Sequence, residues 1–199
     1  RYVKLPGGER IPVLGIGTWF MGESPFNFKQ EVNAVNYAIE RGIRLIDTAE
    51  MYANGGAEKV VGAAIREASE VERKEIFIVS KVLPSNAYFD RVIKACDDSL
   101  QRLGLSYIDL YLLHWRGPAP LQETLDAFKA LQSCGKIRYF GISNFDSKSM
   151  HEWFKCSGGK ALATNQVLYN LSRRGVEWDI IPLCQERGFP IMAYSPLEQ

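Results

Sequence analysis

The chain has 199 residues, of which 46% are hydrophobic and 24% are charged, as in an ordinary globular domain. Its net charge is +1 without long runs of like charge, so neither a nucleic acid nor an anionic membrane is expected as a partner. No apolar stretch approaches the ~20 residues that cross a bilayer, and the sequence shows no signal-peptide pattern. The four cysteines form no CxxC pair and there are only two histidines, so no metal site is expected. We expect reduced cysteines and a cytoplasmic location.

Strands and helices alternate along the first half of the chain. The Pro-Gly-Gly turn in VKLPGGERIP predicts a small hairpin, and the first strand follows within RIPVLGIGTW. Helical periodicity places Val32, Val35 and Ile39 on one side of the next segment, which Gly42 ends. The elements predicted here are, in order, a helix over 29–42, a strand over 43–47, a helix over 57–70 and a strand over 75–80.

The second half repeats this alternation. IDLYLLH is almost continuously apolar, as is typical of a strand covered on both faces. Asp146 is placed to cap a helix that begins at DSKSM. The elements predicted here are a helix over 89–104, a strand over 108–114, a helix over 121–135, a strand over 137–143, a helix after Asp146, a strand over 161–166, a helix over 176–188 and a strand over 190–195.

This alternation, at roughly thirty-residue spacing, predicts right-handed βαβ units with parallel strands. A doubly wound sheet is disfavoured because GIGTW does not continue as the GxGxxG phosphate loop. We therefore predict a single domain over residues 1–199 with the (β/α)8 TIM barrel fold, represented by about seven strands and lacking the last βα portion. A barrel of the usual ~250 residues implies that the natural protein continues past Gln199, by roughly 60–90 residues. The 199-residue piece alone is then expected to be poorly soluble.

Four polar side chains follow predicted strands at points where they can meet. Asp47 and Tyr52 follow LIDTAEMY, Lys81 ends IFIVSK, and His114 ends LYLLH. Because the carboxyl ends of parallel strands lie on one face of a β/α protein, one pocket can contain all four. Taken singly, each has an ordinary structural interpretation, such as a loop cap, a half-buried aromatic, a solvated charge or a core histidine. Together they are the groups that carbonyl reduction requires.

The chemistry follows from the residue types. A phenol has a pKa of about 10, and a nearby ammonium lowers it by stabilising the phenolate. Tyr52 is therefore the expected general acid, Lys81 the cation that tunes it, and Asp47 the partner of Lys81. His114 is expected to donate a hydrogen bond to the carbonyl oxygen and to orient the substrate. The hydride has to come from a bound cofactor, because no side chain carries one.

Seven sequence blocks carry a family resemblance, and they occur in the family's order: GIGTW, RLIDTAEMY, VSKV, YIDLYLLHW, GKIRYFGISNF, NQVLYN and AYSPL. On these blocks the chain resembles the aldo-keto reductases across essentially its whole length. The segments DTAEMYANGGAEKVVG and ATNQVLYNLSRRGVEWDIIPLC are most similar to bacterial members of the methylglyoxal-reductase type. The resemblance implies a (β/α)8 barrel, a monomer, and a reduced nicotinamide cofactor, usually NADPH. It assigns Asp47, Tyr52, Lys81 and His114 the catalytic roles given above.

The resemblance also implies cofactor contacts. Ser143, Asn144 and Gln166 would bind the nicotinamide carboxamide, and Tyr194 would stack on the nicotinamide ring. Ser143 and Asn144 have an alternative interpretation as the N-cap of the helix that follows them. The complete set of expected cofactor residues is Gly17, Thr18, Asp47, Ser143, Asn144, Gln166, Tyr194, Ser195 and Leu197. The residues that read the 2′-phosphate of NADPH are expected beyond the seventh strand.

The expected substrate pocket is aromatic. Trp19 and Trp115 would form apolar walls around Tyr52 and His114, which suits a small neutral carbonyl compound such as methylglyoxal. Trp19 and Trp115 have an alternative role in packing loops onto the barrel. Two other functions remain open: a regulatory, non-catalytic member of the same fold that binds the cofactor, and an isomerase or lyase that uses no nicotinamide.

Overall fold

A computed structural model describes residues 1–68 and 71–198. A two-stranded antiparallel hairpin, β1 (Tyr2–Lys4) and β2 (Arg10–Pro12), comes first. Seven parallel strands then form one sheet, in the order β3-β4-β5-β6-β7-β8-β9. Their bounds are Ile16–Gly17 for β3, Leu45–Asp47 for β4, Phe77–Val82 for β5, Ile108–Leu113 for β6, Ile137–Ser143 for β7, Asn165–Leu168 for β8 and Ile191–Tyr194 for β9.

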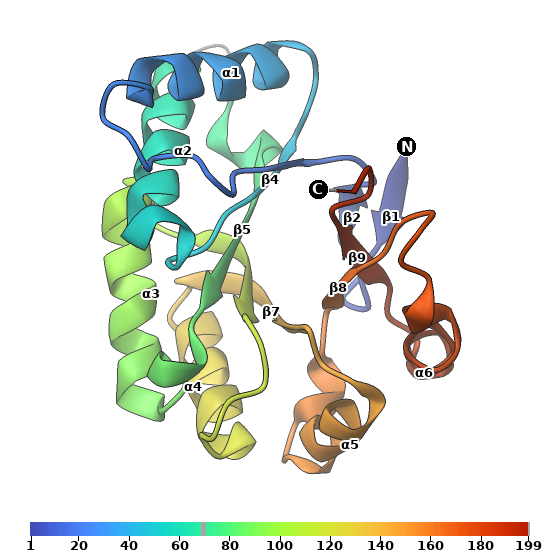
Figure 1. The fold of residues 1–199 in the computed structure, drawn as a ribbon. Coiled ribbons are helices and arrows are strands. Elements are labelled where there is room, and N and C mark those ends of the chain that lie inside the picture. Colours follow the sequence, from blue (N-terminus) through green and yellow to red (C-terminus); the bar gives the residue numbers. More distant parts are fainter. Residues whose placement is uncertain (69–70, 199) are drawn as a thin grey trace.

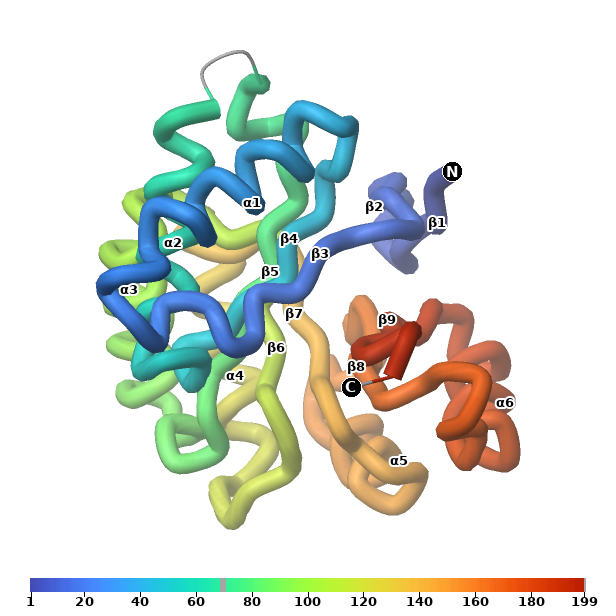
Figure 2. The backbone as a smooth tube through the Cα atoms, turned by 45° about the horizontal axis from the view of Figure 1, so that its top comes forward, coloured from blue at the N-terminus to red at the C-terminus, as the bar shows by residue number. Residues whose placement is uncertain are grey.

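Each strand pairs with its neighbour in the chain, so the sheet has no point at which the strand order reverses. A doubly wound sheet has such a reversal, whereas a β/α barrel winds in one direction. Figures 1 and 2 show the strands curving around a common axis, with the helices on the outer side. The helices are α1 (Phe28–Glu40), α2 (Gly56–Glu67), α3 (Phe89–Leu103), α4 (Leu121–Ser133), α5 (Ser147–Lys155) and α6 (Ile180–Arg187).

Two apolar clusters hold this arrangement together. The larger one lies between the sheet and the helices and includes Ile46, Ile78 and Tyr111. The smaller one lies on the inner side of the sheet, where Val79 and Leu110 meet Leu5 of the hairpin loop. All residues of β5 and β6 are buried, which explains why both strands are nearly continuous apolar runs. The hairpin therefore packs its apolar side chains into the interior of the barrel.

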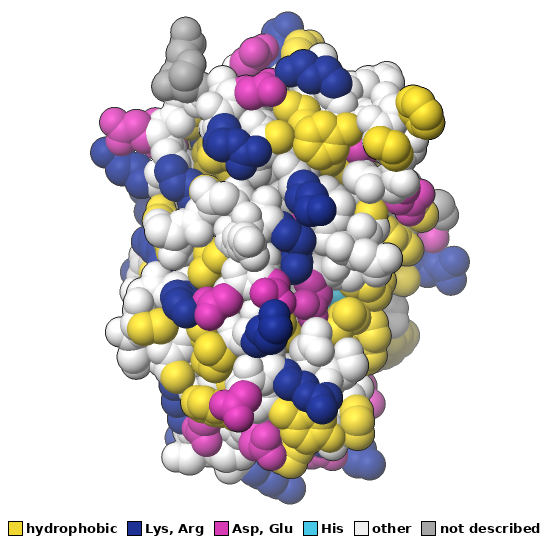
Figure 3. Space-filling view, turned by 90° about the vertical axis from the view of Figure 1, so that its left-hand side faces the viewer, with side chains coloured by type: hydrophobic (Ala, Val, Ile, Leu, Met, Phe, Trp, Pro, Cys, Tyr) yellow, Lys and Arg dark blue, Asp and Glu magenta, His cyan; other side chains and the backbone are white. Residues whose placement is uncertain are grey.

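The outer surface has mixed charge. On the helical face in Figure 3, Lys and Arg side chains alternate with Asp and Glu side chains. Exposed ion pairs occur within and between helices, such as Lys94 with Asp98 in α3 and Lys29 of α1 with Glu67 of α2. Such exposed pairs contribute little to stability but keep a helical surface solvated. Among the described residues, no helix is long and apolar enough to cross a bilayer.

Most predicted elements are observed within a few residues of their predicted bounds. The Asp146 cap is confirmed, because its carboxylate accepts a hydrogen bond from the Ser149 backbone N–H at 2.7 Å. The first barrel strand is shorter than predicted, since residues 10–12 pair in the hairpin instead. The sixth strand begins at Asn165 rather than at residue 161, because residues 159–161 form a 3-10 turn. The predicted helix end at residues 69–70 lies outside the described residues.

Candidate active site

The carboxyl ends of the strands bring the predicted polar residues around one cavity of about 680 Å³. β4 ends at Asp47, β7 ends at Ser143 and β9 ends at Tyr194, while His114 directly follows β6. The predicted site residues that line this cavity are Gly17, Trp19, Asp47, Tyr52, His114, Trp115, Ser143, Asn144, Gln166, Tyr194 and Ser195. Predicted site residues up to 178 positions apart in sequence, from Gly17 to Ser195, thus share one pocket.

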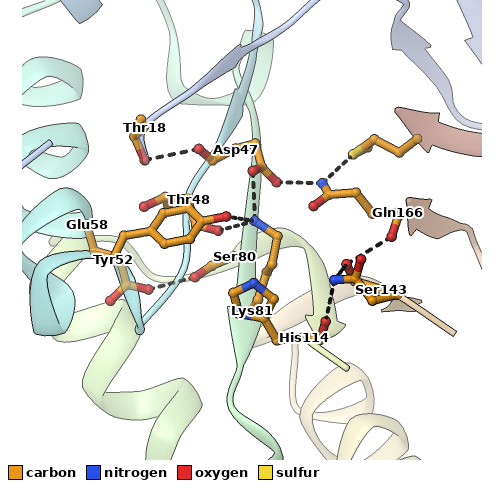
Figure 4. Close-up of polar contacts among 12 residues, drawn as sticks. Thr18, Asp47, Thr48, Tyr52, Glu58, Ser80, Lys81, His114, Ser143 and Gln166 are labelled. Atoms are coloured by element: carbon orange, nitrogen blue, oxygen red, sulfur yellow. Dashed lines mark hydrogen bonds and ion pairs between the residues drawn. The ribbon is translucent and has the colours of Figure 1, made fainter. Parts of the chain in front are cut away.

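Lys81 lies at the centre of a hydrogen-bonded group of residues behind this cavity (Figure 4). Its ammonium donates to Asp47 Oδ2 at 2.7 Å, to the Thr48 carbonyl at 3.0 Å and to the Tyr52 hydroxyl at 3.0 Å. The residue is fully buried, so these three acceptors replace water for the three N–H bonds of the ammonium. A buried cation is tolerable here because a carboxylate is in direct contact with it.

Burial and charge oppose each other in setting the pKa values of this group. Burial acts to lower the pKa of Lys81, but the nearby Asp47 and Tyr52 outweigh it, so the pKa is raised and the ammonium stays charged. Burial raises the pKa of Tyr52 above its ordinary value, while Lys81 acts in the opposite direction. The direction of the Lys81 contribution agrees with the prediction from the sequence, but the effect of burial on the pKa of Tyr52 is larger. At neutral pH Tyr52 is therefore a protonated phenol beside a cation.

The loop that carries Tyr52 has an unusual backbone. Ala53, Asn54 and Gly55 follow it with φ angles of 50°, 51° and 84°, all in the left-handed region. Gly adopts this region freely and Asn does so more readily than most residues, but for Ala it is unfavourable. The three residues turn the chain from Tyr52 into α2, so that the phenol points back toward Lys81. The position of Tyr52 therefore depends on a strained local conformation.

His114 is buried next to this group. Burial, together with the charge of Lys81, lowers its pKa to about 3, so its imidazole is neutral at neutral pH. The ring lies edge-on to Tyr52, with 5.8 Å between ring centroids. Among the described residues its Nδ1 atom has no hydrogen-bond partner although it is buried. A neutral imidazole carries one N–H donor and one acceptor nitrogen, which suits it to orient a polar ligand atom.

The residues predicted to bind the cofactor are joined to the catalytic candidates by hydrogen bonds. Gln166 Nε2 donates to Asp47 Oδ1 at 2.8 Å. Asn144 Nδ2 donates to the His114 carbonyl at 3.1 Å and to Ser143 Oγ at 3.2 Å. The helix that follows these residues is capped by Asp146, so the N-cap interpretation of Ser143 and Asn144 does not hold. Their side chains are directed to the site instead.

The remaining predicted cofactor residues are spread more widely. The Tyr194 hydroxyl donates to Asn144 Oδ1 at 2.9 Å, and the carbonyl of Ser195 accepts from Asn170 Nδ2. Thr18 is fully buried and donates to the Asp47 carbonyl at 3.1 Å, so it supports β4 from behind. Leu197 is 94% exposed and is not among the residues that line the cavity.

Aromatic rings form one wall of the cavity. The rings of Trp19 and Phe20 are stacked with a centroid distance of 4.7 Å, and the ring centroids of Trp19 and Tyr52 are 6.4 Å apart. The ring centroid of Trp115 lies 4.8 Å from that of His114. Trp19 and Trp115 are both partly exposed at the mouth, so they are available to contact a ligand.

Several residues that support the site were not predicted from the sequence. The Thr48 carbonyl holds Lys81, the Met192 sulfur lies 3.0 Å from Gln166 Nε2, and Glu58 accepts a hydrogen bond from Ser80. Only Glu58 had a usable signal, since a glutamate in the first turn of a helix near a catalytic loop is a candidate buried acid. Among the described residues, no group of His, Cys, Asp and Glu is arranged to hold a metal ion.

Comparisons with known proteins agree with this geometry. The sequence profile of the aldo/keto reductase family matches residues 13–199. The chain belongs to the aldo/keto reductase family. The methylglyoxal reductase YeaE of Escherichia coli (strain K12) is 49% identical over 199 residues, which are all of this chain and 69% of that protein. The glyoxal reductase of Bacillus subtilis (strain 168) is 36% identical, over 99% of this chain and 67% of that protein. This aldo-keto reductase chain thus spans about two thirds of the length of these relatives.

A solved structure supports the barrel. The aldo/keto reductase from Klebsiella pneumoniae, in complex with NADP and acetate, has a TM-score of 0.93 and 47% identity. The match covers 98% of this chain and 68% of that one. The predicted fold class is therefore confirmed, with seven of the barrel strands among the described residues. The predicted oxidoreductase class is confirmed at the level of the family, whose similar members are named as reductases.

Proposed function

We propose that this aldo-keto reductase reduces small aldehydes and 2-oxoaldehydes, such as methylglyoxal, to alcohols with NADPH. The observation that carries the proposal is the Lys81 ammonium, which contacts both Asp47 and the Tyr52 hydroxyl behind the cavity. Similarity to a methylglyoxal reductase and a glyoxal reductase supports the substrate class. The crystallised relative with bound NADP supports the cofactor. A cytoplasmic location and a monomeric state stay predictions from the sequence.

The chain offers suitable groups for a nicotinamide cofactor. The amides of Asn144 and Gln166 and the Ser143 hydroxyl lie together, and they match the donors and acceptors of a carboxamide. The ring of Tyr194 borders the same cavity and offers a flat face for stacking. When bound, NADPH supplies the hydride for the carbonyl carbon. These four residues would hold its nicotinamide end.

The chain's own residues supply the proton and the orientation. The Tyr52 hydroxyl donates its proton to the carbonyl oxygen as negative charge develops there. Lys81 stabilises the phenolate that remains, and Asp47 keeps Lys81 charged and in place. Neutral His114 donates a hydrogen bond to the same oxygen and fixes the carbonyl orientation. Because the imidazole of His114 is neutral at neutral pH, it has no extra proton to give, and Tyr52 remains the proton donor.

The lining of the cavity favours a neutral substrate. Trp19, Met51 and Trp115 provide apolar surface near Tyr52. Among the described lining residues, Asp47 is the only Asp or Glu, and Arg and Lys do not occur. A carboxylate-bearing substrate would therefore find no cationic partner there, whereas a small aldehyde would find one polar end and apolar walls.

The test is NADPH oxidation by the full-length protein, followed by absorbance with methylglyoxal, propanal and glyoxylate. We expect turnover of the two neutral aldehydes and weak turnover of the acid, with NADH measured in parallel for the cofactor preference. Tyr52→Phe removes only the hydroxyl and should slow single-turnover hydride transfer by at least ~100-fold while NADPH still binds. Tyr88→Phe, at a partly exposed ring before α3, is the matched control and should leave the rate unchanged.

NADPH binding without turnover of any aldehyde would favour the regulatory, non-catalytic alternative. Absence of NADPH binding would favour a barrel enzyme without nicotinamide. Full activity of Tyr52→Phe would contradict the assignment of the general acid.

A further inference from the structure

The Tyr52 loop needs something to hold its unfavourable backbone. Ala53, Asn54 and Gly55 all have positive φ angles directly after Tyr52. Left-handed conformations at consecutive residues persist only where the surroundings enforce them. The hydroxyl of Tyr52 must nevertheless stay at 3.0 Å from Lys81 for the electrostatic effect to operate. The contacts around this loop therefore affect the proton transfer proposed for Tyr52.

Arg102 of α3 is the side chain that covers this loop. A Cβ atom added at Gly55 would overlap the side chain of Arg102, so the arginine packs directly against the left-handed glycine. Its Nε donates to Glu58 Oε2 at 2.5 Å, and its terminal nitrogen donates to Ser99 Oγ at 3.1 Å. The guanidinium is thus fixed by two further partners, which makes it a rigid support for the loop.

Glu58 connects this support to the strand that carries Lys81. Its side chain is fully buried in the first turn of α2, close behind the Tyr52 loop. Its Oε1 accepts a hydrogen bond from Ser80 Oγ at 2.6 Å, and Ser80 immediately precedes Lys81 in β5 (Figure 4). One buried carboxylate therefore contacts the arginine over the Tyr52 loop and the residue next to Lys81.

We propose that Glu58 and Arg102 are positioning residues for the reduction: their ion pair holds the Tyr52 loop at a fixed distance from the β5 residue Lys81. Neither residue lines the cavity, so both act through Tyr52 and Lys81 rather than on the substrate. The inference rests on the proposed role of Tyr52 as general acid. Its consequence is that the rate of proton-coupled hydride transfer depends on an ion pair formed between α2 and α3.

The test uses Arg102→Met in the full-length protein. Loss of the guanidinium should let the Tyr52 loop relax away from Lys81. We expect single-turnover hydride transfer to slow about 10–100-fold, the scale of a displacement of ~1 Å at a catalytic group. The NADPH dissociation constant should change by less than about threefold, because the cofactor contacts come from β7 to β9. The part of the pH–rate profile that reports Tyr52 should move to higher pH, since the phenol loses stabilisation by Lys81.

Two further variants and one control make the outcome decisive. Arg102→Lys keeps a cation beside Glu58 and should recover part of the rate. Ser80→Ala leaves the ion pair intact and removes only its link to β5, so a decrease of about two- to tenfold is expected. Lys94→Met removes an exposed ion pair from the same helix, with Asp98, and should have no effect on the rate. If Arg102→Met does not fold, the rate and pH–rate profile of Ser80→Ala alone test the inference.

Unchanged rates and pH profiles in folded Arg102→Met or in Ser80→Ala would overturn the inference and leave the ion pair a purely structural feature. This failure is distinguishable from failure of the proposed function. In the latter case Tyr52→Phe itself would retain its rate, whatever the behaviour of the Arg102 variants.

Discussion

The two sides of the site differ in how completely the chain itself organises them. On the β4–β6 side, Lys81 is fully buried and has three hydrogen-bond acceptors. On the β8–β9 side, no residue of β9 is buried, and Leu197 beyond it is almost fully exposed. The groups proposed for proton transfer are thus enclosed by the described chain. Of the groups proposed for cofactor binding, Ser143 and Gln166 are buried as well, and Tyr194 lies on β9, the edge strand of the described sheet.

The burial of the Tyr52–Lys81 side has a physical reason. Electrostatic effects on a proton donor are strong only where water is excluded, so Tyr52 and Lys81 need a buried environment before any ligand arrives. The β8–β9 side is proposed to hold the nicotinamide end of the cofactor rather than to transfer the proton. The comparison predicts that substitutions on the first side change the rate of the chemical step, while substitutions on the second side change mainly cofactor affinity.

The largest effect is expected for Lys81→Met on the buried side. The substitution removes the cation that opposes the burial effect on Tyr52, so the pKa of the phenol should rise further. We expect the single-turnover rate at neutral pH to fall by about 100-fold or more, with NADPH affinity retained. The pH–rate profile checks the cause: if it overlays that of the wild type, Lys81 does not tune Tyr52.

A smaller effect is expected for Asp47→Asn. The amide oxygen of Asn can still accept a hydrogen bond from Lys81, but the negative charge that raises the pKa of Lys81 is lost. Lys81 should then lose its proton at a lower pH, and the rate should decline earlier on the alkaline side. We expect a rate loss of roughly tenfold at neutral pH, about one pKa unit of interaction. An effect larger than that of Lys81→Met would show that Asp47 acts directly on the ligand.

The pH dependence of stability tests the burial of His114. Because burial lowers its pKa in the folded state from 6.5 to about 3, the unfolded chain binds a proton between these values and the folded chain does not. The stability contribution of neutral His114 is therefore complete above pH 6.5 and is lost as pH falls toward 3. In chemical denaturation, His114→Gln should remove up to about 1.4 kcal/mol per pH unit of this dependence.

His151→Gln is the control for that experiment, since His151 lies exposed on α5. Identical pH dependence in the wild type and His114→Gln would mean that His114 is protonated in the folded protein as readily as in the unfolded one.

The smallest effect is expected for Tyr194→Leu on the β8–β9 side. Loss of an aromatic stack is worth about 0.5–1.5 kcal/mol, so the NADPH dissociation constant should rise roughly 2–10-fold. The hydride-transfer rate at saturating NADPH should change less than the affinity does. Titration by nicotinamide fluorescence measures the first quantity and stopped-flow absorbance the second. If Tyr194→Leu binds NADPH normally but transfers hydride much more slowly, the two sides of the site do not have separate roles in chemistry and cofactor binding.

Much of the fold and part of the site followed from the sequence. Hydrophobic periodicity and glycine stops are local signals, and they placed the β/α alternation correctly. They also located Asp47, Lys81 and His114 at strand ends, and parallel strands necessarily gather those ends on one face. The same local signals could not show that residues 10–12 pair in the hairpin, because pairing depends on a partner strand.

Tertiary structure decided the properties that depend on distance and burial. Gln166 bonds to Asp47 across 119 positions, and Arg102 bonds to Glu58 across 44, and no local pattern records either contact. The rise in the pKa of Tyr52 likewise requires the packed surroundings, since burial is its largest cause and the neighbouring Lys81 cation acts in the opposite direction. The sequence by itself thus determined which chemical groups reach the mouth of the barrel. Only the fold decided their protonation and what holds them, because burial and Coulomb interactions act through space rather than along the chain.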